Sequence, residues 1–209
     1  MNETNMRRKD FEVKEEEAIR EFLESRTYGF LALKSDGTYP ALIPLNYVYF
    51  QGAVYFHGST KGEKMKLMEK NSEVSFALAK EFGIIPSYFT NEEWACPASS
   101  YFKSVLIRGR AVFVEDAEEK ARVLNAFMAK LQPEGGYRSI APEIPEYERV
   151  LRGTSLVKII PEQISAKFKF GQNLKEKERK GVQTGLRERG APADGDILEC
   201  MERFSSGNL

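Results

Sequence analysis

The chain has few of the side chains that build covalent frameworks or metal sites. Its 209 residues include two cysteines, Cys96 and Cys200, and a single histidine, His57. Two cysteines are too few for a disulfide framework, and neither has the spacing of a metal ligand. A lone histidine excludes a histidine-rich metal site. We therefore expect no bound metal, and the low cysteine content fits a reducing compartment such as the cytoplasm.

An excess of charge of one sign is also absent, because 31 basic residues balance 31 acidic ones. The chain thus lacks the overall basic field of nucleic-acid-binding proteins, and we expect nucleic acid not to be a partner. The N-terminal segment carries Arg7, Arg8 and Lys9 and lacks the apolar core of a signal peptide, which again favours a cytoplasmic protein.

One uncharged stretch, from Gly37 to Thr60, is long enough to cross a bilayer. It contains Pro40 and Pro44, however, and it is rich in β-branched and aromatic residues, which is not how a membrane-spanning helix is built. We interpret it as two adjacent buried strands joined by a turn and expect no membrane association.

Common catalytic signatures are missing as well. The chain has no Gly-x-Ser-x-Gly motif of a serine hydrolase and no Gly-x-Gly-x-x-Gly motif after its first predicted strand. The segment from Gly58 to Lys64 reads Gly-x-x-x-Gly-x-Lys, which is not the spacing of a nucleoside-triphosphate-binding loop. These absences favour chemistry that is carried by a cofactor.

Hydrophobic periodicity predicts a mainly β fold with peripheral helices. Alternating or continuous apolar runs predict strands over residues 27–33, 39–50, 53–57, 73–80, 101–115 and 155–165. Asp36-Gly37 has the composition of a tight hairpin turn with positive φ angles. Helical periodicity predicts helices over 14–25, 62–71, 116–131 with Asp116 as its N-cap, and a last helix that ends at Gly207. Six strands in meander-like order predict a small closed antiparallel barrel.

The chain divides by composition into three segments. Residues 1–26 form a helical lead-in, residues 27–170 the barrel with its inserted helices, and residues 171–209 a helical appendage that packs on the barrel or on a partner. Residues 81–100 are predicted to form a long loop that carries Phe82, Tyr88, Phe89 and Trp94. Because so much aromatic surface is seldom left in water, we expect a ligand or a second subunit to cover it.

The segment from His57 to Lys64 is the strongest candidate for a binding site. A predicted strand ends there in a loop with glycines, hydroxyls and lysines, and a predicted helix follows. Backbone N–H groups at a helix start, together with Ser59, Thr60, Lys61 and Lys64, could hold a monophosphate. The alternative is an ordinary solvated turn with lysines on a helix face.

Two further groups could take part in chemistry near this loop. His57 could donate a hydrogen bond to a ligand ring, carry a proton with a pKa near 6.5, or be only a polar strand end. In the segment Pro44-Leu45-Asn46-Tyr47, the backbone and Asn46 could hydrogen-bond a flat heteroaromatic ring. Asn46 could equally serve only to relieve the bend after Pro44.

Several short motifs occur together in an order that resembles a known family. They are Arg7-Arg8-Lys9-Asp10, Tyr28-Gly29-Phe30-Leu31-Ala32, Pro44-Leu45-Asn46-Tyr47-Val48-Tyr49, Tyr55-Phe56-His57-Gly58 with Gly62 and Lys64, Tyr101-Phe102-Lys103-Ser104-Val105 with Gly109, and Lys167-Phe168-Lys169-Phe170-Gly171-Gln172-Asn173. The chain resembles the nitroimidazole-resistance branch of the pyridoxamine 5′-phosphate oxidase-like flavoproteins, best over residues 6–131. The last motif is similar to a segment of regulator-like members of that superfamily.

The resemblance implies a six-stranded FMN-binding split β-barrel that dimerises and binds FMN at the subunit interface. It implies that Pro44, Leu45, Asn46 and Tyr47 line the flavin ring. It further implies that Gly58, Ser59, Thr60, Lys61, Gly62 and Lys64 bind the phosphate side, with His57 near the ring or the substrate as the catalytic candidate. Tyr101, Lys103 and Ser104 are implied to come from the second subunit, and Gln172 and Asn173 to close over the ligand.

The resemblance also implies an FMN-dependent oxidoreductase that reduces nitro compounds or other small acceptors with NAD(P)H. The substrate-phosphate residues of the vitamin-forming oxidases are missing near the C-terminus, which argues against pyridoxamine phosphate as the substrate. Two alternatives remain. One is a flavin-binding sensor or regulator without turnover, suggested by eight basic and three acidic residues between Lys167 and Arg189. The other is a related barrel that holds haem or a deazaflavin.

Overall fold

The computed structural model describes residues 6–205. The chain folds into two compact units, each built from segments that are distant in sequence. Unit 1 consists of Met1–Arg20, Ala79–Val105 and Ser165–Leu209, and unit 2 of Glu21–Leu78 and Leu106–Ile164.

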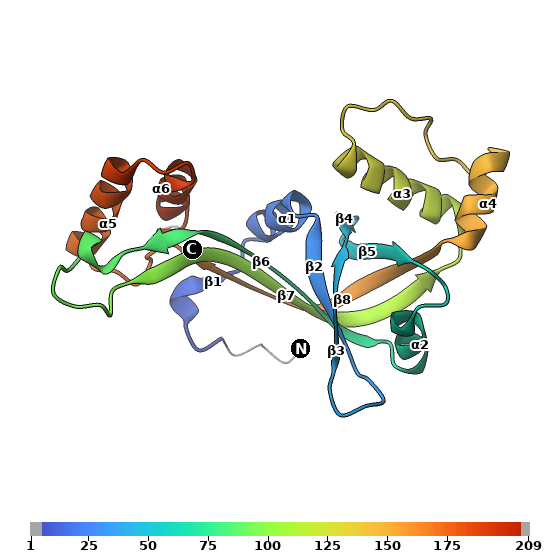
Figure 1. Cartoon of the computed structure of the whole chain (residues 1–209), viewed down its shortest axis with the longest axis horizontal. Helices are drawn as coiled ribbons and strands as arrows, with labels where there is room; N and C mark the ends of the chain where they lie inside the picture. The colour runs from blue at the N-terminus through green and yellow to red at the C-terminus, as the bar shows by residue number, and fades with distance from the viewer. Residues whose placement is uncertain (1–5, 206–209) are drawn as a thin grey trace. The chain divides into compact units, whose positions relative to one another are not determined.

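The strands form one sheet with the order β3-β2-β6-β7-β8-β5-β4, and β1 pairs with β8 (Figure 1). The strands are β1 (Glu12–Val13), β2 (Tyr28–Leu33), β3 (Ala41–Asn46), β4 (Val48–Phe50), β5 (Ala53–Gly58), β6 (Glu73–Ile85), β7 (Ser99–Val114) and β8 (Ser155–Lys169). The pairs β1–β8, β2–β3, β2–β6, β4–β5 and β5–β8 are all antiparallel. The predicted class, a mainly antiparallel split barrel with peripheral helices, is confirmed, with eight strands within residues 6–205 in place of six.

The structure has the four helices predicted by their bounds, a further helix within residues 171–209, which were expected to be helical, and one helix that the sequence prediction missed. They are α1 (Glu16–Ser25), α2 (Glu63–Lys70), α3 (Ala117–Leu131), α4 (Pro145–Gly153), α5 (Glu176–Arg189) and α6 (Asp194–Arg203), with 3₁₀ turns η1 (Lys9–Phe11) and η2 (Ser87–Phe89). Asp116 caps α3 as predicted, since its carboxylate accepts the N–H of Glu119 at 2.7 Å. The predicted end of the last helix at Gly207 lies outside the described residues. Within residues 6–205, none of the helices is both long and apolar enough to cross a membrane.

The tight hairpin turn lies at Gln51-Gly52 rather than at Asp36-Gly37. Gln51 and Gly52 both have positive φ, 48° and 80°, which is the signature of a two-residue turn between β4 and β5. Gly37 does not have positive φ, and it belongs to a seven-residue connection between β2 and β3. The prediction of a tight turn at Asp36-Gly37 was therefore wrong. Ser35 instead organises the longer loop by accepting the Gly37 N–H at 3.2 Å.

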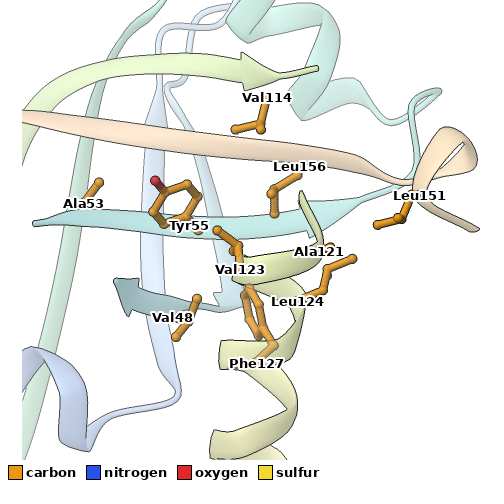
Figure 2. Close-up of a cluster of buried hydrophobic side chains, with 10 residues drawn as sticks. All are labelled: Val48, Ala53, Tyr55, Val114, Ala121, Val123, Leu124, Phe127, Leu151 and Leu156. Carbon is orange, nitrogen blue, oxygen red and sulfur yellow. The ribbon is translucent and has the colours of Figure 1, made fainter. Parts of the chain in front are cut away.

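Unit 2 has a core in which α3 packs on strands β4, β5 and β8 (Figure 2). The labelled side chains in that view are Val48, Ala53, Tyr55, Val114, Ala121, Val123, Leu124, Phe127, Leu151 and Leu156. Toward the β3 end of the sheet, the ring of Phe76 on β6 fills the space above Gly29 on β2. A Cβ on Gly29 would lie 2.2 Å from that ring, so the glycine makes the close packing of the two strands possible.

The predicted strand over 39–50 is broken at Tyr47, and this break separates β3 from β4. The Tyr47 N–H donates to the carbonyl of Thr27, and its buried hydroxyl donates to the carbonyl of Leu23 at 2.7 Å. Tyr47 thus ties the end of β3 to the C-terminal end of α1, where carbonyl groups lack helical partners.

Replacing Tyr47 by phenylalanine is expected to lower the free energy of unfolding by about 1 kcal/mol, because the Leu23 carbonyl loses its donor. Urea unfolding of the variant measures this change. Tyr39→Phe is the matched control, since Tyr39 is 82% exposed, and it should leave the free energy of unfolding unchanged. Equal unfolding of Tyr47→Phe and the parent would contradict the assigned hydrogen bond.

Unit 1 has an aromatic core beneath α5 and α6. Phe168 of β8 and Phe170, which directly follows that strand, contact Phe204 with ring centroids 5.2 and 6.0 Å apart, and Phe170 also meets Phe82 at 5.2 Å. Phe82 belongs to β6, which runs on to Ile85, so the predicted loop over 81–100 was wrong in its first part.

Two glycines on one face of α5 let that helix pack closely on η2. A Cβ on Gly185 would lie 2.4 Å from the ring of Phe89, and one on Gly181 would lie 2.4 Å from the Phe89 carbonyl oxygen. The two glycines are four residues apart and therefore share a helix face. Several basic side chains of the stretch between Lys167 and Arg189 have partners in unit 1. Lys180 pairs with Glu176 at 2.6 Å, and Arg189 pairs with Asp194 through two nitrogens.

Candidate functional site

The candidate site in unit 2 is the transition from β5 through residues 59–62 to α2. β5 supplies His57 and Gly58 at its end, and α2 begins at Glu63 after the N-cap Gly62. Ser59 organises the loop, since its hydroxyl accepts the Lys61 N–H at 3.3 Å and its carbonyl accepts the Gly62 N–H at 3.3 Å. Ser59, Thr60 and Lys61 are exposed. The loop therefore presents hydroxyl, ammonium and backbone donors to solvent.

No side chain caps the N-terminus of α2. The N–H groups of Met65 and Lys66 reach the Gly62 carbonyl at 3.1 and 3.5 Å, whereas those of Glu63 and Lys64 have no acceptor among the described residues. Uncapped N–H groups in the first turn of a helix carry partial positive charge and can bind an anion. The arrangement thus has the donors that the sequence predicted for a phosphate.

Lys64 lies directly over Gly58. A Cβ built on Gly58 would lie 2.9 Å from Lys64 Nζ and 3.3 Å from Met65 Cε, so the glycine leaves room for the lysine to fold back over the strand end. Because of this packing, the ammonium group sits above the loop and not on the outer face of the helix. The structure thus brings together Lys64 and Gly58, two of the predicted site residues.

His57 is next to this pair and packs against α3. Its ring meets the ring of Phe127 edge-on, with centroids 5.2 Å apart and an interplanar angle of 80°. Although His57 is exposed to solvent on one side, its partial desolvation against α3 lowers its pKa below the usual value near 6.5, and the Lys64 charge lowers the pKa further. The imidazole is therefore biased toward its uncharged form beside a cation-rich loop.

Helix α3 also contacts Tyr47, which was predicted to line a ligand ring. The Lys130 ammonium donates to the Arg26 carbonyl and lies 4.7 Å from the centroid of the Tyr47 ring. Burial lowers the pKa of Lys130 to about 8, with a smaller contribution from Arg26. Phe127 and Lys130 are three residues apart and so share one helix face. Sequence reasoning missed both, because nothing in a 3.6-residue period shows which strand a helix face will meet.

The other residues of the predicted ring-lining strand have mixed exposure. Pro44 lies opposite Phe30 and Leu45 opposite Gly29 in the β2–β3 pair. Pro44 is exposed, whereas Leu45 is buried. The Asn46 amide donates to the Thr27 carbonyl at 3.2 Å, so this part of the side chain serves the bend between β3 and β4.

Three predicted residues lie on β7 within unit 1. Tyr101 is buried, and its hydroxyl has no hydrogen-bond partner among the described residues. Burial raises the pKa of Tyr101 to about 12. The Lys103 ammonium lies 5.1 to 5.8 Å from the ring centroids of Phe82, Phe168, Phe170 and Phe204. Ser104 donates to the Lys167 carbonyl at 3.4 Å.

Gln172 and Asn173 follow β8 in unit 1. The Gln172 side chain is buried and closes a local loop, because its amide nitrogen donates to the Phe168 carbonyl and its oxygen accepts the Phe170 N–H, both at 2.7 Å. Asn173 is exposed. Gly171, with φ of 78°, starts this turn beside the Tyr101 hydroxyl.

An open pocket of about 560 Å³ lies between the β2–β3 loop and α2. Tyr39, Leu42 and Leu67 give it an apolar wall, and Glu63, Lys66 and Lys70 are its charged residues on α2. Lys70 is engaged with Asp36 of the facing loop. Since Glu63 is the first residue of α2, the pocket begins beside the phosphate-type loop and could hold a small molecule next to it.

Comparison with solved structures shows the fold. The flavocytochrome Anf3 from Azotobacter vinelandii is 20% identical with a TM-score of 0.67, covering 84% of this chain and 77% of that chain. A FAD and heme binding protein from Mycobacterium smegmatis is 16% identical with a TM-score of 0.61, covering 77% and 74%. A protein provisionally assigned to 5-nitroimidazole antibiotic resistance, from Bacteroides thetaiotaomicron, is 18% identical with a TM-score of 0.61, covering 75% and 85%.

Comparison of the sequence with curated proteins gives no match. The family model of pyridoxamine 5′-phosphate oxidase, in contrast, matches residues 15–168, which is more than half of the chain. The matched region contains β2 to β7, most of β8 and the whole transition from β5 to α2. The chain therefore belongs to the pyridoxamine 5′-phosphate oxidase family.

Proposed function

We propose that this protein binds FMN and holds its phosphate at the start of α2. The observation that carries the proposal is the fold-back of Lys64 over Gly58, beside two helical N–H groups without acceptors among the described residues. A phosphate monoester would receive charge-assisted hydrogen bonds from Lys64 and Lys61 and further bonds from the loop. Two structural neighbours are named for flavin or FAD binding, which supports a flavin as the ligand.

The residues around the loop fit the rest of such a ligand. His57 is exposed and supplies a ring nitrogen that can donate a hydrogen bond, and the buried Phe127 ring supports it from behind. FMN carries one phosphate, and the loop has the donors for one such group. We therefore favour FMN over FAD as the cofactor.

We further propose an oxidoreductase that uses NAD(P)H to reduce nitro compounds or other small acceptors. A bound flavin would supply the electron-accepting ring, and the chain would orient it, exclude water and place positive charge near it. The open pocket beside α2 has room for a small acceptor. His57 can donate a hydrogen bond to the flavin or the product in its uncharged form.

A homodimer with FMN at its interface completes the proposal. The outer face of the β2–β3 pair carries Tyr28, Phe30 and Leu42 with exposed fractions of 51, 46 and 65%. These side chains lie on one face of the pair, since Phe30 is opposite Pro44 and Ala32 opposite Leu42. Aromatic and aliphatic groups clustered in this way are usually covered by a partner or a ligand.

An absorption spectrum of the protein as purified, with the mass of any released small molecule, tests the proposal. We expect two broad flavin bands in the near-visible range, and we expect them to bleach when NADH or NADPH is added under anaerobic conditions. A colourless protein that does not bind added FMN would overturn flavin binding. A flavin that binds but does not bleach would instead favour the alternative of a flavin-binding sensor or regulator. An intense Soret band would identify haem, which is in the name of one structural neighbour, the FAD and heme binding protein.

A further inference from the structure

Helix α3 contacts β5 at two points on the same side of the strand. Tyr55 and His57 are two residues apart and therefore point to the same face of the sheet. Tyr55 donates to Glu119 Oε1 at 2.9 Å, and His57 meets the Phe127 ring. Glu119 and Phe127 are eight residues apart, about two helical turns. The helix is thus fixed to β5 by a polar contact near its start and an aromatic contact further along.

The contact between Tyr55 and Glu119 also includes a lysine, so the three side chains together carry no net charge. Lys158 of β8, which lies opposite Tyr55, donates to the same Glu119 oxygen at 3.1 Å. The Glu119 carboxylate therefore has its cation, and on α3 it lies about two turns before Phe127, which the His57 ring contacts. Figure 2 shows Tyr55 and Phe127 on the two sides of Val123 in this cluster.

Elements α2, β8 and α3 lie next to His57. On α2 it faces Lys64, whose charge acts on its titration. On β8 its register partner is the apolar Leu156, and the next charged residue, Lys158, is paired with Glu119. On α3 the charged residue closest to Phe127 in sequence is Lys130, whose ammonium donates to the Arg26 carbonyl. Among the described residues, no carboxylate is paired with His57.

From this arrangement we propose that Phe127 is a positioning residue that holds the His57 ring edge-on against α3, beside the Lys64 ammonium. The inference concerns the site of the proposed function but does not depend on flavin binding. Its consequence is that the lysines and the helix N-terminus alone supply the positive charge of the site. His57 then offers a neutral N–H donor and a neutral acceptor, and it becomes a cation only in acid.

The single histidine of the chain makes the test direct, because one imidazole signal set reports its titration by NMR. In ligand-free protein, the titration midpoint is expected below 6.5. Phe127→Leu keeps an apolar side chain but removes the aromatic ring, and it should raise the midpoint toward 6.5. Lys64→Met should also raise it, since a positive neighbour is removed.

Val123→Ala is the matched control. Val123 is fully buried on the same helix and in the same core cluster as Phe127, and its loss should lower thermal stability without moving the His57 midpoint. A midpoint at or above 6.5 in the parent protein would overturn the proposal, even if the variants fail to fold. So would a Phe127→Leu midpoint equal to or below that of the parent. Loss of flavin binding alone would contradict only the proposed function.

Discussion

Replacing Gly109 by alanine is expected to lower the free energy of unfolding by about 3 kcal/mol, at the upper end of the range for overpacking. A Cβ at this position of β7 would lie 2.0 Å from the Ile160 carbonyl oxygen, 2.9 Å from its carbon and 3.1 Å from Pro161 Cα. All three atoms belong to the backbone of β8. No rotation of a side chain can therefore relieve the contact, and the two strands must separate locally.

For a chain of this length such a loss corresponds to a fall of about 6–12 °C in Tm. Thermal unfolding and urea unfolding measure it. Gly153→Ala is the matched control, because a Cβ there meets nothing within 4 Å and the residue ends α4, so stability should stay equal or rise slightly. Should Gly109→Ala melt like the parent, the close approach of β7 and β8 at this point would be disproved.

The contrast with Gly29 shows why Gly109 is the more sensitive position. Both glycines would meet an atom at close to 2 Å if a Cβ were added, but at Gly29 that atom belongs to the Phe76 ring. A ring can tilt or shift by a few tenths of an ångström, whereas a strand backbone carries its hydrogen-bonded neighbours with it. Of the two glycines, Gly109 is therefore the one whose replacement must disturb the sheet itself.

The elements that local sequence determines were predicted well. The helix over 116–131 was predicted from its Asp116 cap and its apolar stripe, and the strand over 53–57 from its apolar run. The loop from His57 to Lys64 could be located because its strand, turn and helix start are contiguous in sequence. Each of these signals lies within about ten residues, where periodicity and turn chemistry are informative.

The errors have a common cause in contacts between distant segments. Residues 81–85 continue β6, although Gly83 reads as a loop residue; its missing side chain leaves room for Ile197 of α6, whose Cδ1 would lie 2.9 Å from a Cβ there. The break at Tyr47 depends on Thr27 and Leu23, some twenty residues away. The contact of His57 with Phe127 spans 70 residues. None of these pairings has a local pattern that would reveal it.

Helix α4 was missed for a different reason. Three prolines between residues 132 and 147 predict a loop, and by composition Pro145 cannot be told apart from the other two. Pro145 instead stands at the first position of α4, where its missing N–H costs nothing and its fixed φ suits a helix. The helix returns Leu151 to the unit 2 core, and the buried Lys120 ammonium donates to the Leu151 carbonyl at 3.2 Å.

The second large effect is expected at the phosphate end of the proposed site. Lys64→Ala should weaken FMN binding by about 1–3 kcal/mol, because one charge-assisted hydrogen bond to the phosphate is lost. This corresponds to a dissociation constant about 5- to 150-fold higher. Riboflavin has the same ring without the phosphate, so its affinity should hardly change. Fluorescence titration of the apoprotein with both ligands measures the difference.

Lys66→Ala is the control for a general loss of positive charge on α2. Lys66 is exposed two residues further along the helix and lines the open pocket, whereas Lys64 folds back over Gly58. If FMN and riboflavin weaken equally in Lys64→Ala, the lysine acts on the ring and not on the phosphate. If Lys64→Ala and Lys66→Ala weaken FMN binding by the same factor, the effect comes from the overall positive charge of α2 and not from a contact with the phosphate. The phosphate position between β5 and α2 is supported only if Lys64→Ala weakens FMN binding while riboflavin binding and the Lys66→Ala variant stay close to the parent. In that case a direct contact with the phosphate, and not the net charge of the helix, governs the affinity.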